Sequence, residues 1–119
     1  MKTEERAAQM WSVLAFAARS RQMLTYSMMS QLTGMMTPGV GQMLEPIQSY
    51  CLLNKRPPLT VLVVSDSTGL PGRGFIAAAD VPKALVDVFA FDWLKHGAPT
   101  PQEFAAALAQ RPSNGVREP

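Results

Sequence analysis

Only one stretch of this chain has the pattern of a buried β-strand: Leu59-Thr60-Val61-Leu62-Val63-Val64. It is rich in β-branched residues and almost continuously apolar, which predicts a strand that is covered on both faces. The glycine- and proline-containing stretch from Ser65 to Gly74 predicts a loop, and Phe75-Ile76 predicts the start of a return strand. The sequence therefore predicts a single short β-hairpin, and the other elements that its patterns indicate are helices.

Three helices are expected before this hairpin, from apolar spacing and from end signals. The first runs from about Thr3 to Arg21, and the second from about Tyr26 to Leu32, ended by Gly34. The third begins with Thr37 as its N-cap and Pro38 in its first turn. Because Pro46 removes one backbone hydrogen bond, we expect the third helix to kink or split near residues 42–45.

Two further helices are expected after the hairpin. One starts at Asp80 as its N-cap, runs to about Leu94 and is closed by Gly97. The other opens with Thr100-Pro101-Gln102-Glu103, a full capping box, and ends near Gln110. Residues 1–110 are thus expected to form a single domain, and residues 111–119 a flexible, solvated tail.

Composition excludes several classes of site. The 119 residues include one cysteine, Cys51, and one histidine, His96. This rules out an internal disulfide framework, a cysteine-rich zinc site and a multi-histidine metal site, so we expect no metal and no cofactor. Cys51 lies on the apolar side of the third helix and is expected to be a buried structural thiol. His96 is expected to favour the end of a helix electrostatically.

The chain also lacks the signals of a membrane or secreted protein. Its longest apolar run, Met10 to Ala18, is far shorter than the ~20 residues that a membrane span needs. Glu4 and Glu5 precede this run, where a signal peptide would carry basic residues. We therefore expect a cytoplasmic protein with no membrane partner.

The order of the expected elements is helix, helix, turn, helix, strand, loop, strand. This is the order of a winged helix-turn-helix, in which a glycine turn joins the two central helices and the Ser65–Gly74 loop forms the wing. The predicted fold class is therefore α+β: a small winged-helix-like domain with a short β-hairpin and additional C-terminal helices. The pattern leaves a generic small α+β domain as the alternative.

Several short motifs within residues 10–75 resemble the C-terminal, DNA-binding domain of the O6-alkylguanine-DNA alkyltransferases and alkyltransferase-like proteins. Thr25-Tyr26-Ser27 resembles the Thr-Tyr-Gly that starts the second helix of that family, and Val40-Gly41-Gln42-Met43-Leu44 resembles the Val-Gly-x-Ala-Leu of its recognition helix. The family's proline-flanked approach to the active-site strand, its Val-Val ending and its glycine-rich loop are resembled by Arg56-Pro57-Pro58-Leu59, Val63-Val64 and Gly69 to Gly74. The resemblance implies a winged-helix fold and DNA binding.

The chain departs from this family where the family's chemistry takes place. The family's nucleophile lies in a Pro-Cys-His-Arg motif, and the corresponding stretch here is about Leu59-Thr60-Val61-Leu62. Alkyl transfer needs an activated thiolate, which threonine without a base cannot replace. The family's base-stack arginine would fall near Pro38 and is also missing. We therefore expect a non-enzymatic protein that has this fold without alkyl-transfer chemistry.

The first hypothesis for function is a nucleic-acid-binding domain that holds phosphates and a distorted or flipped nucleotide of duplex or single-stranded DNA. By the resemblance, Tyr26 matches the residue that the family uses against the DNA backbone beside the flipped nucleotide. The expected contact residues are Tyr26, Thr37, Gln42, Lys55, Arg56 and Arg73. One observation argues against sequence-specific reading: Glu45 is the only charged residue from Thr37 to Tyr50.

The second hypothesis is a protein-interaction module or small inhibitor, such as a mobile-element accessory or anti-defence factor. All eight methionines lie between Met1 and Met43, and neighbouring methionines on a helix cannot all point inward. Adaptable methionine and aromatic surfaces suit protein partners or a homodimer. The residues expected at such a surface are Met28, Met35, Met36, Phe91 and Trp93.

Overall fold

The structure, a computed structural model, describes residues 2–72 and 75–110. Its elements are α1 (Thr3–Arg19), β1 (Leu24–Thr25), α2 (Tyr26–Thr33), α3 (Thr37–Leu53), the 3₁₀ helix η1 (Leu59–Leu62), β2 (Val63–Val64), α4 (Val81–Ala90), α5 (Trp93–His96) and α6 (Pro101–Ala109). The domain is therefore mostly helical with one small sheet, which confirms the α+β class. The predicted tail, residues 111–119, lies outside the described residues.

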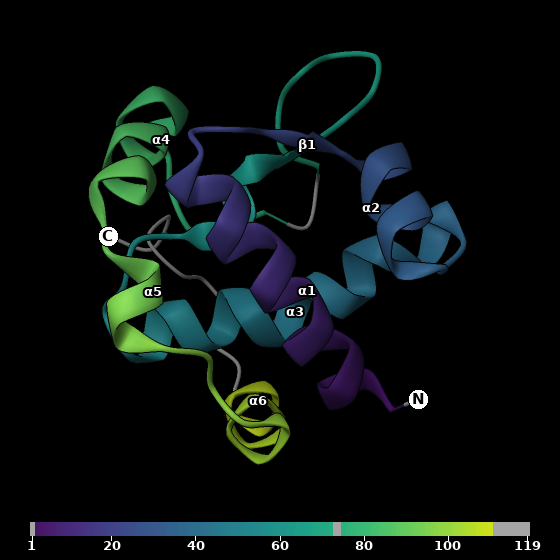
Figure 1. Cartoon of the computed structure of the whole chain (residues 1–119), viewed down its shortest axis with the longest axis vertical. Helices are drawn as coiled ribbons and strands as arrows, with labels where there is room; N and C mark the ends of the chain where they lie inside the picture. The colour runs from purple at the N-terminus through teal and green to yellow at the C-terminus, as the bar shows by residue number, and fades with distance from the viewer. Residues whose placement is uncertain (1, 73–74, 111–119) are drawn as a thin grey trace.

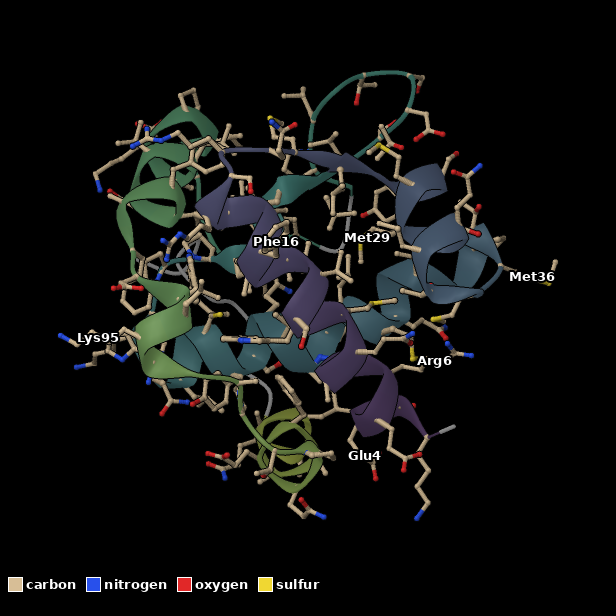
Figure 2. All side chains as sticks on the ribbon, viewed as in Figure 1. Glu4, Arg6, Phe16, Met29, Met36 and Lys95 are labelled. Carbon is tan, nitrogen blue, oxygen red and sulfur yellow. The ribbon has the colours of Figure 1, made fainter. Side chains whose placement is uncertain are left out.

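Helix α1 is the centre of the packing. It contacts α2, α3, α4, α5, α6 and η1, and Figure 1 shows it crossing α3 while α6 lies below both. Four of its seven buried residues are alanines, which lets neighbouring backbones approach closely. Phe16, in contrast, lies on the outward side of this helix and is 67% exposed (Figure 2).

The expected strand is mostly a 3₁₀ helix. Residues Leu59–Leu62 form η1, and only Val63 and Val64 are strand, paired in parallel with Leu24 and Thr25. Because β1 is two residues long, it offers partners to two residues only, and the preceding ones satisfy their backbone groups in a 3₁₀ turn.

The predicted β-hairpin is absent from the described residues. Phe75 and Ile76 are not a strand, and the Ile76 N–H donates to the side-chain oxygen of Gln48 at 2.8 Å. One antiparallel bridge, between Val64 and Pro71, ties the loop back to β2. The loop therefore folds against the domain without forming a hairpin ladder.

The helical predictions are confirmed for α1, α2 and α6, but two others need correction. Helix α3 runs unbroken through Pro46, so it does not split there, and its N-cap is Met36, with Thr37 as the first helical residue in place of the predicted N-cap. Proline there leaves the carbonyl of Gln42 without its usual donor, and Gln42 lies on the exposed side of the helix, where water can bind it.

The single helix predicted from Asp80 to Leu94 is two helices. Phe91 is extended, with φ −78° and ψ 139°, and the Asp92 carboxylate accepts the Lys95 N–H at 3.1 Å. A competing N-cap thus ends α4 and starts α5, which closes at Gly97 as expected.

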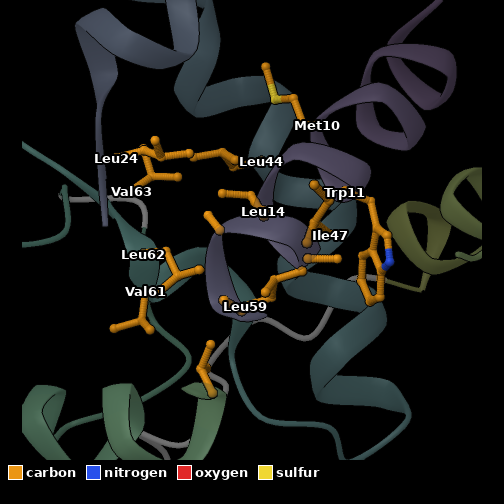
Figure 3. Close-up of a cluster of buried hydrophobic side chains, with 14 of the residues drawn as sticks. Met10, Trp11, Leu14, Leu24, Leu44, Ile47, Leu59, Val61, Leu62 and Val63 are labelled. Carbon is orange, nitrogen blue, oxygen red and sulfur yellow. The ribbon is translucent and has the colours of Figure 1, made fainter. Parts of the chain in front are cut away.

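The core lies between α1, α3, the sheet and the C-terminal helices. Figure 3 shows Leu14, Ile47, Leu59 and Leu62 meeting in it, together with Trp11. The Trp11 ring contacts the rings of Tyr50, Trp93 and Phe104 with centroids 5.5–5.8 Å apart, which joins α1 to α3, α5 and α6. No helix among the described residues has the length and apolarity to span a membrane.

Candidate nucleic-acid interface

A cavity of about 250 Å³ opens where α2, α3, η1, β2 and the segment after the loop meet. Two aromatic rings, Tyr26 and Phe75, contribute to its walls, and polar side chains come from α3 and η1. The lining residues are Tyr26, Pro38, Gly41, Gln42, Leu44, Glu45, Gln48, Thr60, Val63 and Phe75. We call this the Tyr26–Thr60 cavity. It combines flat aromatic surface with amide, carboxylate and hydroxyl groups.

Tyr26 is fixed by the start of α2. The Thr25 hydroxyl accepts the Met28 N–H at 3.1 Å as the N-cap, and Thr25 also pairs with Val64 in the sheet. Gly72 passes so close to the ring that a Cβ at this position would lie 2.5 Å from the Tyr26 Oη. A side chain at this position would therefore push the Tyr26 ring aside.

A second contact holds the loop on α2. The Asp66 carboxylate accepts hydrogen bonds from the backbone N–H and the hydroxyl of Ser27 in the first turn of that helix. The Ser27 hydroxyl is the main reason that the pKa of Asp66 is lowered. An anion at a helix N-terminus is favourable, so this contact positions the loop beside Tyr26.

Helix α3 presents polar groups to the cavity because its apolar stripe faces the other way. Val40 and Ile47 are fully buried in the core, whereas Gln42 is exposed. Gln48 is 8% exposed, and its side-chain oxygen accepts from Ile76. Gln42 and Gln48 thus bring two amides to the cavity at two different depths.

Thr60 supplies the most unusual group of the cavity. Its side chain is 5% exposed, and its hydroxyl oxygen is buried without a hydrogen-bond partner among the described residues. Burying an unpaired hydroxyl costs roughly 1–3 kcal/mol, and most buried polar groups in proteins are paired. Thr60 is also one of the residues that line the cavity.

The structure brings only part of the predicted contact face together. Tyr26 and Gln42 share the cavity, and Thr37 is exposed in the first turn of the same helix. Lys55 and Arg56 follow the other end of α3, which is about 25 Å long at 1.5 Å per residue. The two ends of α3 lie on opposite sides of the molecule (Figure 1). Arg73 lies outside the described residues.

The residues predicted for a protein-binding surface do not form one patch. Met28 is 42% and Met36 80% exposed, and Figure 2 shows Met36 projecting outward from the turn between α2 and α3. Met35 and Phe91 are partly buried against the core. Trp93 is 2% exposed and donates its indole N–H to the Val88 carbonyl at 2.8 Å, so it belongs to the core.

The sequence analysis missed Gln48 and Phe75, which line the cavity, and Gly72, which lies against the Tyr26 ring. It used Thr60 only to exclude a nucleophile. A signal for Thr60 exists, because it is the one polar residue in the otherwise apolar run Leu59–Val64. No comparable signal marks Phe75, whose position depends on the path of the loop.

The thiol and the imidazole lie away from this cavity. Cys51 is buried on the core side of α3, and burial raises the pKa of its thiol to about 12. His96 ends α5 and stacks on Phe91 with the ring centroids 4.7 Å apart. The described residues contain no cluster of histidine, cysteine and acidic side chains that could hold a metal ion.

Comparison of the chain with protein-family models, with curated proteins and with solved structures gives no match.

Proposed function

We propose that this protein is a non-enzymatic DNA-binding domain that receives one unpaired nucleobase in the Tyr26–Thr60 cavity. The observation that carries the proposal is that Thr60, whose buried hydroxyl has no partner among the described residues, lines a cavity that also offers aromatic rings and amides. Proteins that accept flipped bases stack them against aromatic or apolar side chains and hydrogen-bond their edges. The cavity contains groups for both kinds of contact.

In this proposal, α2, the Gly34 turn and α3 act as a helix-turn-helix of winged-helix type. Gly34 has φ +75°, the left-handed conformation that ends α2 and turns the chain toward α3. Thr37 and Gln42 then lie on the exposed side of the first half of α3, beside the mouth of the cavity. Their hydroxyl and amide groups would contact the strand from which the base is taken.

The proposal includes no covalent step. A thiol whose pKa is raised to about 12 is almost entirely protonated at neutral pH, so Cys51 is a poor nucleophile. Thr60 has no imidazole or carboxylate as a hydrogen-bond partner among the described residues that could take its proton. Thr60 is therefore assigned to binding and not to catalysis.

Electrostatics indicate how such binding would depend on salt. The described lining of the cavity includes the carboxylate of Glu45 and no lysine or arginine. Affinity at the cavity would then come from stacking and hydrogen bonds, each stacked base contributing roughly 1–3 kcal/mol. The affinity should therefore fall only slowly as the salt concentration rises. Each neutralised phosphate of a single strand adds about 0.7 to the slope of log affinity against log salt concentration, and the described lining of the cavity offers no cation to neutralise one.

Fluorescence anisotropy with labelled single-stranded and duplex oligonucleotides, at about 50 and about 200 mM salt, tests the proposal. We expect single strands to bind more tightly than perfect duplexes, since a duplex must first give up a base pair. Gln42→Leu should weaken binding roughly tenfold through loss of an amide contact with the bound nucleotide. Gln102→Leu, on the exposed surface of α6, is the matched control. Absence of binding at the lower salt concentration would refute the proposal.

A second candidate function has one specific observation in its favour. Met28 and Leu32, four residues apart on α2, are 42% and 57% exposed and share a face of that helix. Two exposed apolar side chains on one helix face suit contact with a protein partner. This function would be favoured if the chain binds a protein partner at high salt, loses that binding in Leu32→Ser and binds no oligonucleotide.

A further inference from the structure

A second surface site lies beyond the C-terminal end of α3, away from the Tyr26–Thr60 cavity. It is a groove of about 520 Å³, open to solvent, between the segment after α3 and helix α4. Its lining residues are Lys55, Arg56, Pro57, Pro58, Asp87, Ala90 and Phe91. We call it the Lys55–Arg56 groove. Two adjacent cations border it, and prolines and Phe91 supply its apolar surface.

Arg56 is held in place by its neighbours without being neutralised. Its guanidinium carbon lies 6.0 Å from the ring centroid of Tyr50 and 5.8 Å from that of Phe91. Its backbone N–H donates to the Cys51 carbonyl at 2.8 Å. Two aromatic faces and a fixed backbone therefore restrict this side chain, so little conformational entropy remains to be lost when it binds a ligand.

The guanidinium of Arg56 lacks an anionic partner in the described part of the chain. Its Nε is buried and has no hydrogen-bond acceptor there. Asp87 lines the same groove, but the ion pair it forms is with Lys83, at 2.9 Å. A partly buried guanidinium without an anionic partner is costly, and an anion bound in the groove would offset part of that cost.

Lys55 adds a second charge in an unusual backbone conformation. It has φ +54°, in the left-handed region that glycine usually occupies after a helix. A cation beside a helix C-terminus is favourable in itself, and Arg21 after α1 has the same conformation, φ +56°. The backbone conformation alone therefore identifies no site, but Lys55 lines the same groove as Arg56.

From these contacts we propose that the Lys55–Arg56 groove binds a phosphate group. A guanidinium pairs with phosphate through two parallel hydrogen bonds, and a phosphate monoester carries close to two negative charges at neutral pH. That charge matches the two cations. The phosphate belongs either to a small phosphorylated molecule or to a DNA strand. Among the described residues, the groove shares no lining residue with the Tyr26–Thr60 cavity.

The test uses the whole ¹⁵N-labelled chain titrated with inorganic pyrophosphate, at ionic strength held constant with sodium chloride. The signals followed are the Lys55 amide and the Arg56 Nε–H. We expect a saturable shift at both, and Arg56→Gln should weaken the affinity roughly tenfold. A parallel titration with single-stranded oligothymidine distinguishes the sources: a shift at the groove places a backbone phosphate there, and a response to pyrophosphate alone indicates a small phosphorylated ligand.

A matched pair of glycine variants separates binding from folding. Lys55→Gly and Arg21→Gly both relieve a left-handed side chain, so both should raise the Tm by a few degrees, about 3–6 °C. Only Lys55→Gly should weaken pyrophosphate binding, by roughly threefold to tenfold. The proposal is wrong if neither probe shifts the groove signals, if sodium chloride alone produces the same shifts, or if both variants bind pyrophosphate like the parent chain.

Discussion

The buried hydroxyl of Thr60 allows a sharp test of the cavity, because a second threonine serves as its control. Thr60 and Thr33 are equally buried, each 5% exposed. The Thr33 hydroxyl donates to the Met29 carbonyl at 2.7 Å and accepts the Met35 N–H at 3.3 Å. The Thr60 hydroxyl has no partner among the described residues. Substituting valine keeps the shape of both side chains and removes only the hydroxyl.

The two substitutions should have opposite effects on the free energy of unfolding. Thr60→Val removes an unsatisfied polar group, which costs roughly 1–3 kcal/mol when buried, so we expect stabilisation by about 1–2 kcal/mol. Thr33→Val removes both hydrogen bonds of the hydroxyl and leaves the Met35 N–H without its acceptor, so we expect destabilisation by about 1–2 kcal/mol. In a domain of this size, each change corresponds to a Tm shift of roughly 4–8 °C.

Urea denaturation monitored by tryptophan fluorescence measures both effects, with the slope of the free energy against urea expected to stay unchanged. Anisotropy with a single-stranded oligonucleotide gives the functional counterpart. Thr60→Val should lower the affinity by roughly tenfold while raising stability, because the hydroxyl is satisfied only by the ligand. If Thr60→Val destabilises the protein as Thr33→Val does, or binds DNA with undiminished affinity, the reasoning about Thr60 is refuted.

Three further predictions follow from the packing. Gly72→Ala should displace the Tyr26 ring and weaken oligonucleotide binding in the anisotropy assay, since its Cβ would lie 2.5 Å from the hydroxyl, whereas Gly39→Ala should not weaken it. The pKa of the Cys51 thiol is raised to about 12 from an ordinary 9.0, so the free energy of unfolding should fall between about pH 9 and 12, because the unfolded chain loses the thiol proton first. Urea denaturation of Cys51→Ala should show a smaller fall over the same pH range. Phe104→Ala should lower the free energy of unfolding by about 3–5 kcal/mol, measurable as a lower urea midpoint.

Helix positions were predictable where local chemistry decides them. Thr25 as N-cap and Gly34 as the left-handed stop bound α2, and the capping box of Thr100 and Glu103 starts α6. These signals act within one helical turn and need no tertiary information. The same chemistry explains the error at residues 91–92, where Asp92 competes as a cap inside an otherwise continuous apolar pattern.

The β structure was not predictable in the same way. The run Leu59–Val64 has strand composition, but a strand needs a partner, and the partner is the two-residue segment Leu24–Thr25. So short a segment has no periodic signal of its own. The run therefore becomes a 3₁₀ helix wherever β1 offers no backbone groups, and the expected hairpin with Phe75 and Ile76 does not form.

The candidate site was predictable in part. Tyr26 and Gln42 were identified from short motifs, and both line the cavity. Lys55 and Arg56 were grouped with them because a winged fold was expected to bring the residues beside the strand to one face, whereas α3 separates the two pairs. Gln48 was missed because a buried glutamine is recognised only through the contact it makes, here with Ile76.

The most direct test of the central claim compares two labelled duplexes in one anisotropy experiment. One is fully paired, and the other is identical except for a single unpaired nucleotide opposite an abasic position. If the Tyr26–Thr60 cavity accepts a base, the second duplex should bind more tightly by roughly tenfold or more, because the few kcal/mol of unpairing no longer oppose binding. Thr60→Val should remove most of that preference. Equal affinity for the two duplexes, or a preference that persists in Thr60→Val, would contradict the account.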